Sequence, residues 1–135
     1  MLRLDDNQGD LFDGWIPETF RELSPELAFV DKALSGPQVL SPFEKDVETI
    51  GRPGTVIATY VRMMYLKFRF QISYELLVQE VADSYKWRTF CHLPLSGKVP
   101  DDKTLIKLTA RYGEQTVRAI FDAVVQQAVD AKVIR

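Results

Sequence analysis

The chain has 135 residues, a formal net charge of −2, 46% hydrophobic residues and 27% charged residues. This composition is typical of one globular domain, and the sequence contains no low-complexity run. The single cysteine excludes an internal disulfide framework, and the acidic N-terminus lacks the long apolar core of a signal peptide, so we expect a cytoplasmic protein.

Charge is distributed unevenly along the chain. Residues 1–54 carry five basic and eleven acidic side chains, whereas residues 55–135 carry twelve basic and eight acidic ones. This contrast predicts an extended acidic arm over residues 1–23 and a helical domain over residues 24–135. Aromatic side chains of the arm, Phe12, Trp15 and Phe20, are expected to dock on that domain or on a partner. A basic body is compatible with a polyanion on one face.

The stretch 55–70, with the sequence TVIATYVRMMYLKFRF, predicts a central helix. It is apolar on nearly all sides, so it requires neighbours on nearly all sides. It is too short to cross a bilayer, and Arg62, Lys67 and Arg69 interrupt it. Core packing explains its methionine and aromatic content.

Helix-start and helix-stop residues bracket the flanking segments. Ser24 followed by Pro25 predicts a helix that runs to about Leu34, where Gly36-Pro37 stops it. Ser41 and Glu44 have the spacing of a capping box and predict a second helix start. Three further predictions follow along the chain: a helix from Ser73 to about Ser84 with Tyr74, Leu77, Val78, Val81 and Ala82 facing inward, a short helix over Tyr85–His92, and a loop over residues 93–100.

The last two predicted helices meet at Gly113. Asp101 and Asp102 cap a helix that ends at Tyr112, and a final helix spans residues 114–130 with a wide apolar face. Sustained two-residue alternation of apolar residues is missing, so no sheet is predicted. The fold class is therefore all-α, a compact multi-helix domain around the central helix.

The helix over residues 102–112 has a basic face. Lys103, Lys107 and Arg111 recur every four residues, opposite a stripe of Leu105, Leu108, Thr109 and Tyr112 that is expected to face the core. Thr104 flanks the cations, and Arg88 and Lys98 could extend the patch. Such a row suits contacts with DNA phosphates or base edges, although a solvated basic face is the alternative interpretation.

The helix over residues 73–84 is acidic outside, which excludes it from a DNA groove. A supporting helix followed by a basic recognition helix is the division of labour of a helix-turn-helix motif. A short helix and a loop separate the two here, so we predict a helix-turn-helix-like portion rather than the minimal motif.

Two pairs of neighbouring residues could suggest a metal site or a catalytic dyad. The Asp101-Asp102 pair is better explained as a helix cap than as a metal site. Cys91 and His92 are adjacent on a helix and point about 100° apart, so they are not expected to form a nucleophile–base dyad. We therefore predict no catalytic site, no metal and no cofactor.

Several short motifs occur in a characteristic order, most strongly between Gly51 and Leu108. They are Gly51-Arg52-Pro53, an apolar helix, Ile72-Ser73-Tyr74-Glu75-Leu76, Trp87-Arg88-Thr89-Phe90, Val99-Pro100-Asp101 and Thr104-Leu105. In this order the chain resembles the N-terminal domain of bacterial insertion-sequence transposases. No single motif is specific; their order and spacing carry the resemblance over essentially the whole chain.

The resemblance implies a parent transposase whose nuclease domain, of DDE type, has an RNase-H-like fold with Asp, Asp and Glu holding two divalent metals. Residues 1–135 end before any such strand, so we expect this chain not to be an enzyme and to have no small-molecule substrate.

Two hypotheses follow. In the first, the domain recognises the terminal inverted repeats of a mobile element through Lys103, Thr104, Lys107 and Arg111, with Arg88 and Lys98 as flanking contacts. In the second, it is an assembly module in which the arm and the apolar face of residues 114–130 mediate self-association or docking to the catalytic domain. The two can both hold, and an unrelated small helical enzyme is a third possibility.

Overall fold

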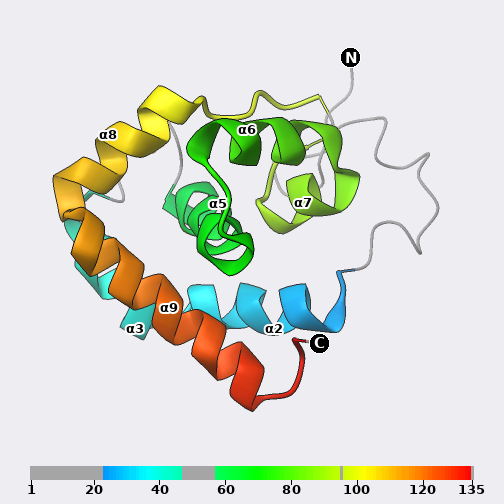
Figure 1. The fold of residues 1–135 in the computed structure, drawn as a ribbon, viewed down its shortest axis with the longest axis vertical. Helices are drawn as coiled ribbons and strands as arrows, with labels where there is room; N and C mark the ends of the chain where they lie inside the picture. Colours follow the sequence, from blue (N-terminus) through cyan, green and yellow to red (C-terminus); the bar gives the residue numbers. More distant parts are fainter. Residues whose placement is uncertain (1–22, 47–56, 95, 135) are drawn as a thin grey trace.

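The computed structural model describes residues 23–46, 57–94 and 96–134, and all regular structure in these ranges is helical (Figure 1). The prediction of an all-α fold is confirmed. The predicted acidic arm, apart from Leu23, and the predicted turn over residues 51–54 lie outside the described residues. The elements are α2 (Pro25–Leu34), α3 (Pro37–Leu40), the 3₁₀ helix η2 (Ser41–Asp46), α5 (Ile57–Phe70), α6 (Tyr74–Asp83), α7 (Tyr85–Phe90), α8 (Asp102–Tyr112) and α9 (Glu114–Asp130).

Helix α5 lies at the centre, as its sequence predicts. Every residue from Thr59 to Leu66 is buried, so the helix is covered around its whole circumference along this length. It packs against α2, α6 and α9, and Figure 1 shows α2 and α9 on one side of it and α6 and α7 on the other. A helix that is apolar on all sides gains stability only when other elements remove each side from water.

The helix starts follow local chemistry. At each of four starts, a side-chain oxygen accepts a hydrogen bond from a backbone amide three residues later, which satisfies one of the donors left unpaired at a helix N-terminus. The four caps are Ser24 Oγ with Leu27 N, Ser73 Oγ with Leu76 N, Ser84 Oγ with Trp87 N, and Asp101 Oδ1 with Thr104 N, at 2.8–3.2 Å.

The helix start predicted at Ser41 differs in the structure. Pro37 already begins a short helix, α3, immediately after the stop at Gly36. Ser41 has the helical φ and ψ of −50° and −47°, and its amide hydrogen-bonds to Pro37 O, so it ends α3 and does not cap a new helix. The chain continues from it as η2, in which Phe43 is fully buried.

Three helices end in a left-handed residue that is not glycine. Gln71, His92 and Lys132 have φ values of 55°, 62° and 62°. The following amide in each case reaches back to a carbonyl five residues earlier, at 2.8–3.2 Å, as in the Schellman motif. Each end therefore carries a conformational cost that a glycine would avoid.

The apolar face of α9 is buried in the domain's own core. Val117, Phe121, Val124 and Ala128 are at most 1% exposed, and α9 packs on α5 and α2. This face is therefore not available as the self-association surface that the second hypothesis requires, because α5 needs it as a neighbour. Val129 of the same helix is 46% exposed, and Ala82, predicted to face inward on α6, is exposed.

A buried arginine joins α5 to α2. Arg62 is 2% exposed, and its Nε donates to Asp31 Oδ1 at 2.8 Å. Its other nitrogens donate to the carbonyl oxygens of Ala58 and Asp31 and to Ser35 Oγ, at 3.0–3.1 Å. The guanidinium is therefore satisfied by four acceptors, as a buried charge must be.

Candidate nucleic-acid interface

Core contacts fix which face of α8 points outward. Leu105 is fully buried, and Thr109 Oγ1 lies 2.8 Å from the hydroxyl of Tyr60 on α5. Burial raises the pKa of Tyr60 to about 12, so this hydroxyl stays neutral and can share a hydrogen bond with Thr109. Tyr112 packs edge-on against the ring of Phe43, with 4.7 Å between centroids. Together these contacts hold α8 by one side.

The opposite side of α8 carries the predicted cations. Lys103, Lys107 and Arg111 are all exposed. Successive members of the row are four residues apart, about 6 Å along the helix axis. The structure thus brings these three predicted residues together on one exposed face.

Thr104 has a different environment. It is half-buried, and both its amide and its hydroxyl hydrogen-bond to the Asp101 carboxylate. These hydrogen bonds hold the pKa of Asp101 below its usual value, so the cap remains charged. Thr104 therefore serves the start of α8, and its hydroxyl is engaged within the domain.

Arg88 organises the loop that leads to α8. Its Nη1 donates to the carbonyl oxygens of Pro94 and Gly97 at 3.0 and 2.7 Å, and its Nε donates to Ala82 O at 3.1 Å. These bonds tie the loop to the end of α6. Lys98, in the same loop, is exposed and precedes α8. Of the two predicted flanking residues, Lys98 has the exposure that an outside contact requires, while Arg88 positions the loop.

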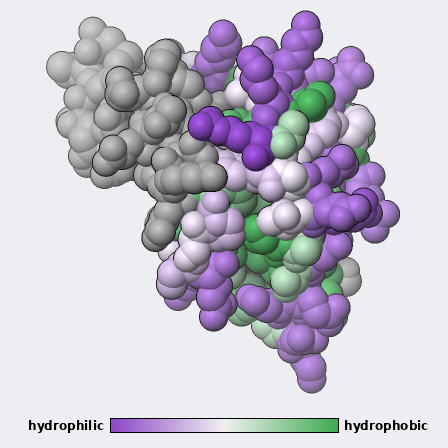
Figure 2. Space-filling model, turned by 90° about the vertical axis from the view of Figure 1, so that its left-hand side faces the viewer, coloured by the Kyte–Doolittle hydropathy of each residue, from purple (hydrophilic) through white to green (hydrophobic). Residues whose placement is uncertain are grey.

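Helix α6 presents carboxylates beside this face. It packs against α8, and Glu75, Glu80 and Asp83 are exposed, as predicted. Figure 2 views the molecule from the side where α8 and α9 meet, and hydrophilic residues cover most of the described surface there, around a smaller hydrophobic area. A polyanion approaching this side would meet attraction at α8 and repulsion at α6.

Ile106 is a residue on this face that the sequence argument did not single out. It is 46% exposed, although it is a large apolar side chain in the middle of α8. The available signal was its spacing, since it lies three residues after Lys103 and four before Ala110, about 100° around the helix from Leu105.

Cys91 and His92, predicted to lie on a helix, follow the end of α7 and have different surroundings. Cys91 is fully buried, burial raises the pKa of its thiol, and its carbonyl accepts from Thr59 Oγ1 at 2.8 Å. His92 Nε2 instead lies 3.3 Å from Asp31 Oδ1. Burial and the Arg62 guanidinium lower the pKa of His92, and they outweigh the attraction of Asp31.

The chain matches the family model described as Transposase domain (DUF772) over residues 16–111. The chain belongs to this family. Comparison with curated proteins and with solved structures gave no significant match. The transposase-domain match includes α8 through Arg111, so all six predicted contact residues lie inside it. It ends before α9, the helix that completes the core around α5.

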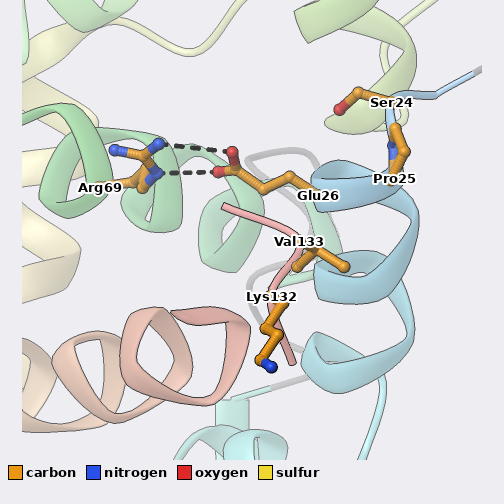
Figure 3. Close-up of a pocket in the computed structure, with 6 residues that line it drawn as sticks. All are labelled: Ser24, Pro25, Glu26, Arg69, Lys132 and Val133. Carbon is orange, nitrogen blue, oxygen red and sulfur yellow. Dashed lines mark hydrogen bonds and ion pairs between the residues drawn. The ribbon is translucent and has the colours of Figure 1, made fainter. Parts of the chain in front are cut away.

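A surface pocket of about 430 Å³ is lined by the start of α2, by Arg69 near the end of α5 and by Lys132 and Val133 after α9 (Figure 3). Arg69 Nε donates to Glu26 Oε2 at 2.9 Å, and the hydroxyl of Tyr65 donates to the same oxygen at 2.8 Å. Lys132, also in the lining, points its ammonium away from this pair. The carboxylate and the guanidinium in this lining are therefore paired with each other.

Two further findings concern metal binding and membrane-spanning helices. Within the described ranges, no three His, Cys, Asp or Glu side chains are grouped so that they could hold a metal ion. Among the helices of those same ranges, none combines the length and apolarity needed to cross a membrane.

Proposed function

We propose that this transposase domain is the DNA-binding, non-catalytic N-terminal part of a DDE-type transposase, and that it contacts the terminal repeats of a mobile element through α8. The observation that carries the proposal is the row of exposed cations, Lys103, Lys107 and Arg111, on one face of a helix in a transposase-domain protein. Each cation that approaches a phosphate releases condensed counterions, which is the main source of affinity for duplex DNA.

Charge around α8 favours an approach along the flank of the helix. Asp101 and Asp102 stand at its N-terminus, where recognition helices of helix-turn-helix proteins usually contact bases. These carboxylates would repel phosphates from that end. Lys107 and Arg111, in the second half of the helix, are farther from them. We therefore expect the strongest phosphate contacts at Lys107 and Arg111, with Lys103 and Lys98 adding weaker ones.

The helix-turn-helix-like arrangement is part of the same proposal. Helix α6 packs against α8 and would act as the supporting helix, while its exposed carboxylates keep DNA on α8. Arg88 would act by holding the loop before α8, so its replacement should weaken binding through loss of loop geometry.

Fluorescence anisotropy with the 135-residue chain tests this function. The probes are a duplex carrying the element's terminal repeat and a scrambled duplex, each titrated at several salt concentrations. Replacing Lys107 and Arg111 together with alanine should weaken binding to both duplexes. It should also reduce the slope of log K against log salt by about 2, because two phosphate contacts are lost.

The matched control is Lys32→Ala, which removes an exposed lysine from α2. It should leave both affinity and salt slope unchanged. If the Lys107/Arg111 double variant binds as tightly as Lys32→Ala, the assignment of α8 is wrong. Absence of salt-dependent binding by the unmodified chain would reject DNA binding altogether.

A further inference from the structure

The exposed face of α8 contains an apolar strip beside its cations. At about 100° per residue, Ile106 and Ala110 lie about 60° and 20° to one side of Lys103 around the helix. Lys107 and Arg111 lie about 40° and 80° to the other side. All five residues are exposed, so they form one continuous surface with two chemically different halves.

The strip lies outside the contact that α8 makes with the core. Beyond Ile106 around the helix come Asp102, then Thr109 and Leu105, and the last two are buried against α5 and its neighbours. Ile106, with 46% of its surface exposed, is left at the boundary between the core and the row of cations. Around the helix, Ile106 is about 60° from Lys103, 100° from Lys107 and 140° from Arg111. A partner that covers this whole face would therefore meet cations on one side and an apolar side chain on the other.

Duplex DNA has this combination in its major groove. Phosphates line the edge of the groove, and the C5 methyl of thymine is the apolar group exposed on its floor. Contacts between small or branched apolar side chains and that methyl are a recurrent form of base recognition. Phosphate contacts position a protein, whereas contacts of this kind carry sequence information.

We infer that Ile106, with Ala110 beside it, reads thymine methyl groups, so that the α8 surface prefers A·T-containing sites with thymine opposite Ile106. This inference rests on the proposed function and deepens it, because it assigns the specificity to apolar residues and the affinity to the cations. Removing a methyl from the contact should weaken binding roughly three- to fivefold, the cost of exposing one buried CH₂-sized group.

Uracil provides the test, because it differs from thymine by this methyl alone. The probes are two fluorescein-labelled 20-bp duplexes of alternating sequence, dA·dT and dA·dU, titrated with the 135-residue chain at one fixed salt concentration. The unmodified chain should bind the thymine duplex several-fold more tightly. Ile106→Ala should bring the ratio of the two dissociation constants close to one while the salt slope stays unchanged.

Leu76→Ala is the matched control, since Leu76 is a similarly exposed apolar residue, 40% accessible, on the acidic helix α6. It should retain the full thymine-to-uracil ratio. Far-UV circular dichroism verifies that both variants are folded, as expected for changes at exposed positions.

The outcomes separate the two proposals. Equal, salt-dependent affinity of the unmodified chain for both duplexes would overturn methyl recognition and leave DNA binding by α8 intact. A ratio that persists in Ile106→Ala would also overturn it, because another residue or the duplex shape would then be sensed. Lack of salt-dependent binding to either duplex would overturn the proposed function itself.

Discussion

Replacing Arg62 with methionine should lower the free energy of unfolding by about 2–4 kcal/mol. Methionine retains most of the aliphatic stem but removes all four hydrogen bonds of the guanidinium. The Asp31 carboxylate and the Ser35 hydroxyl then lose their buried donor. The estimate lies toward the low end for broken buried ion pairs because the Asp31 side chain is 35% exposed and water can partly replace Arg62.

Urea denaturation followed by circular dichroism measures this loss. For a domain of this size, about 3 kcal/mol corresponds to a decrease in Tm of roughly 10 °C. Arg118→Met is the matched control, since the Arg118 side chain is 66% exposed and its Nε lies 3.9 Å from Asp122 Oδ2, a long distance for an ion pair. That change should cost less than about 0.5 kcal/mol.

A double-mutant cycle with Asp31→Ala tests the physical reason. The effects of Arg62→Met and Asp31→Ala should fall short of additivity by at least about 1 kcal/mol, because each removes the partner of the other. If Arg62→Met costs no more than Arg118→Met, or if the two network changes are additive, the buried arginine does not stabilise the junction of α2 and α5 in the way described.

Three further predictions concern local conformation and pH. Gly113→Ala should cost about 1–3 kcal/mol in urea denaturation, because φ is 93° at this position; Gly36→Ala, at a φ of −81°, is the control and should be close to neutral. Gln71→Gly should instead stabilise by up to about 1 kcal/mol, because glycine adopts its φ of 55° without cost; a loss of stability would contradict this account of the helix end. The pKa of His92 is lowered in the folded state, so its contribution to stability is complete above the ordinary value of 6.5 and is lost as pH falls below it; His92→Gln should flatten the decline in urea midpoint between pH 7.5 and 5.5, and an equally steep decline in the variant would refute this role.

The sequence determined most helix ends and the interior position of one helix. Ser24, Ser73 and Asp101 start helices because their side chains accept from amides only three residues away. Gly113 ends α8 because a left-handed conformation favours glycine. The central position of α5 followed from apolar residues on all of its sides. These signals depend on neighbours within one helical turn or on periodicity within one segment, so they are complete in the sequence.

Sequence periodicity could also place the cations of α8 on one face, but it could not say which polar side chains the fold would use internally. Arg88 and Thr104 were predicted to contact DNA; in the structure Arg88 donates to the loop carbonyls of Pro94 and Gly97, and the Thr104 amide donates to the Asp101 cap. Arg62 interrupts an apolar segment, and its burial is stabilised by the carboxylate of Asp31, which lies on α2. Each of these outcomes depends on groups brought together from different elements.

Whether an apolar helix face is buried in the domain's own core or left for a partner also depends on the tertiary structure. The sequence of α9 shows a wide apolar face, and this face is equally suited to a partner or to the domain's own core. The structure places it against α5 and α2, because burial there completes the cover of a helix that is apolar all round. Ile106 has the opposite fate: its apolar side chain stays exposed because Leu105 and Thr109 already fill the contact between α8 and the core. The hydrophobic effect favours burial of both the α9 face and Ile106. The surface around α5 is limited, so only some of these apolar residues can be buried against it.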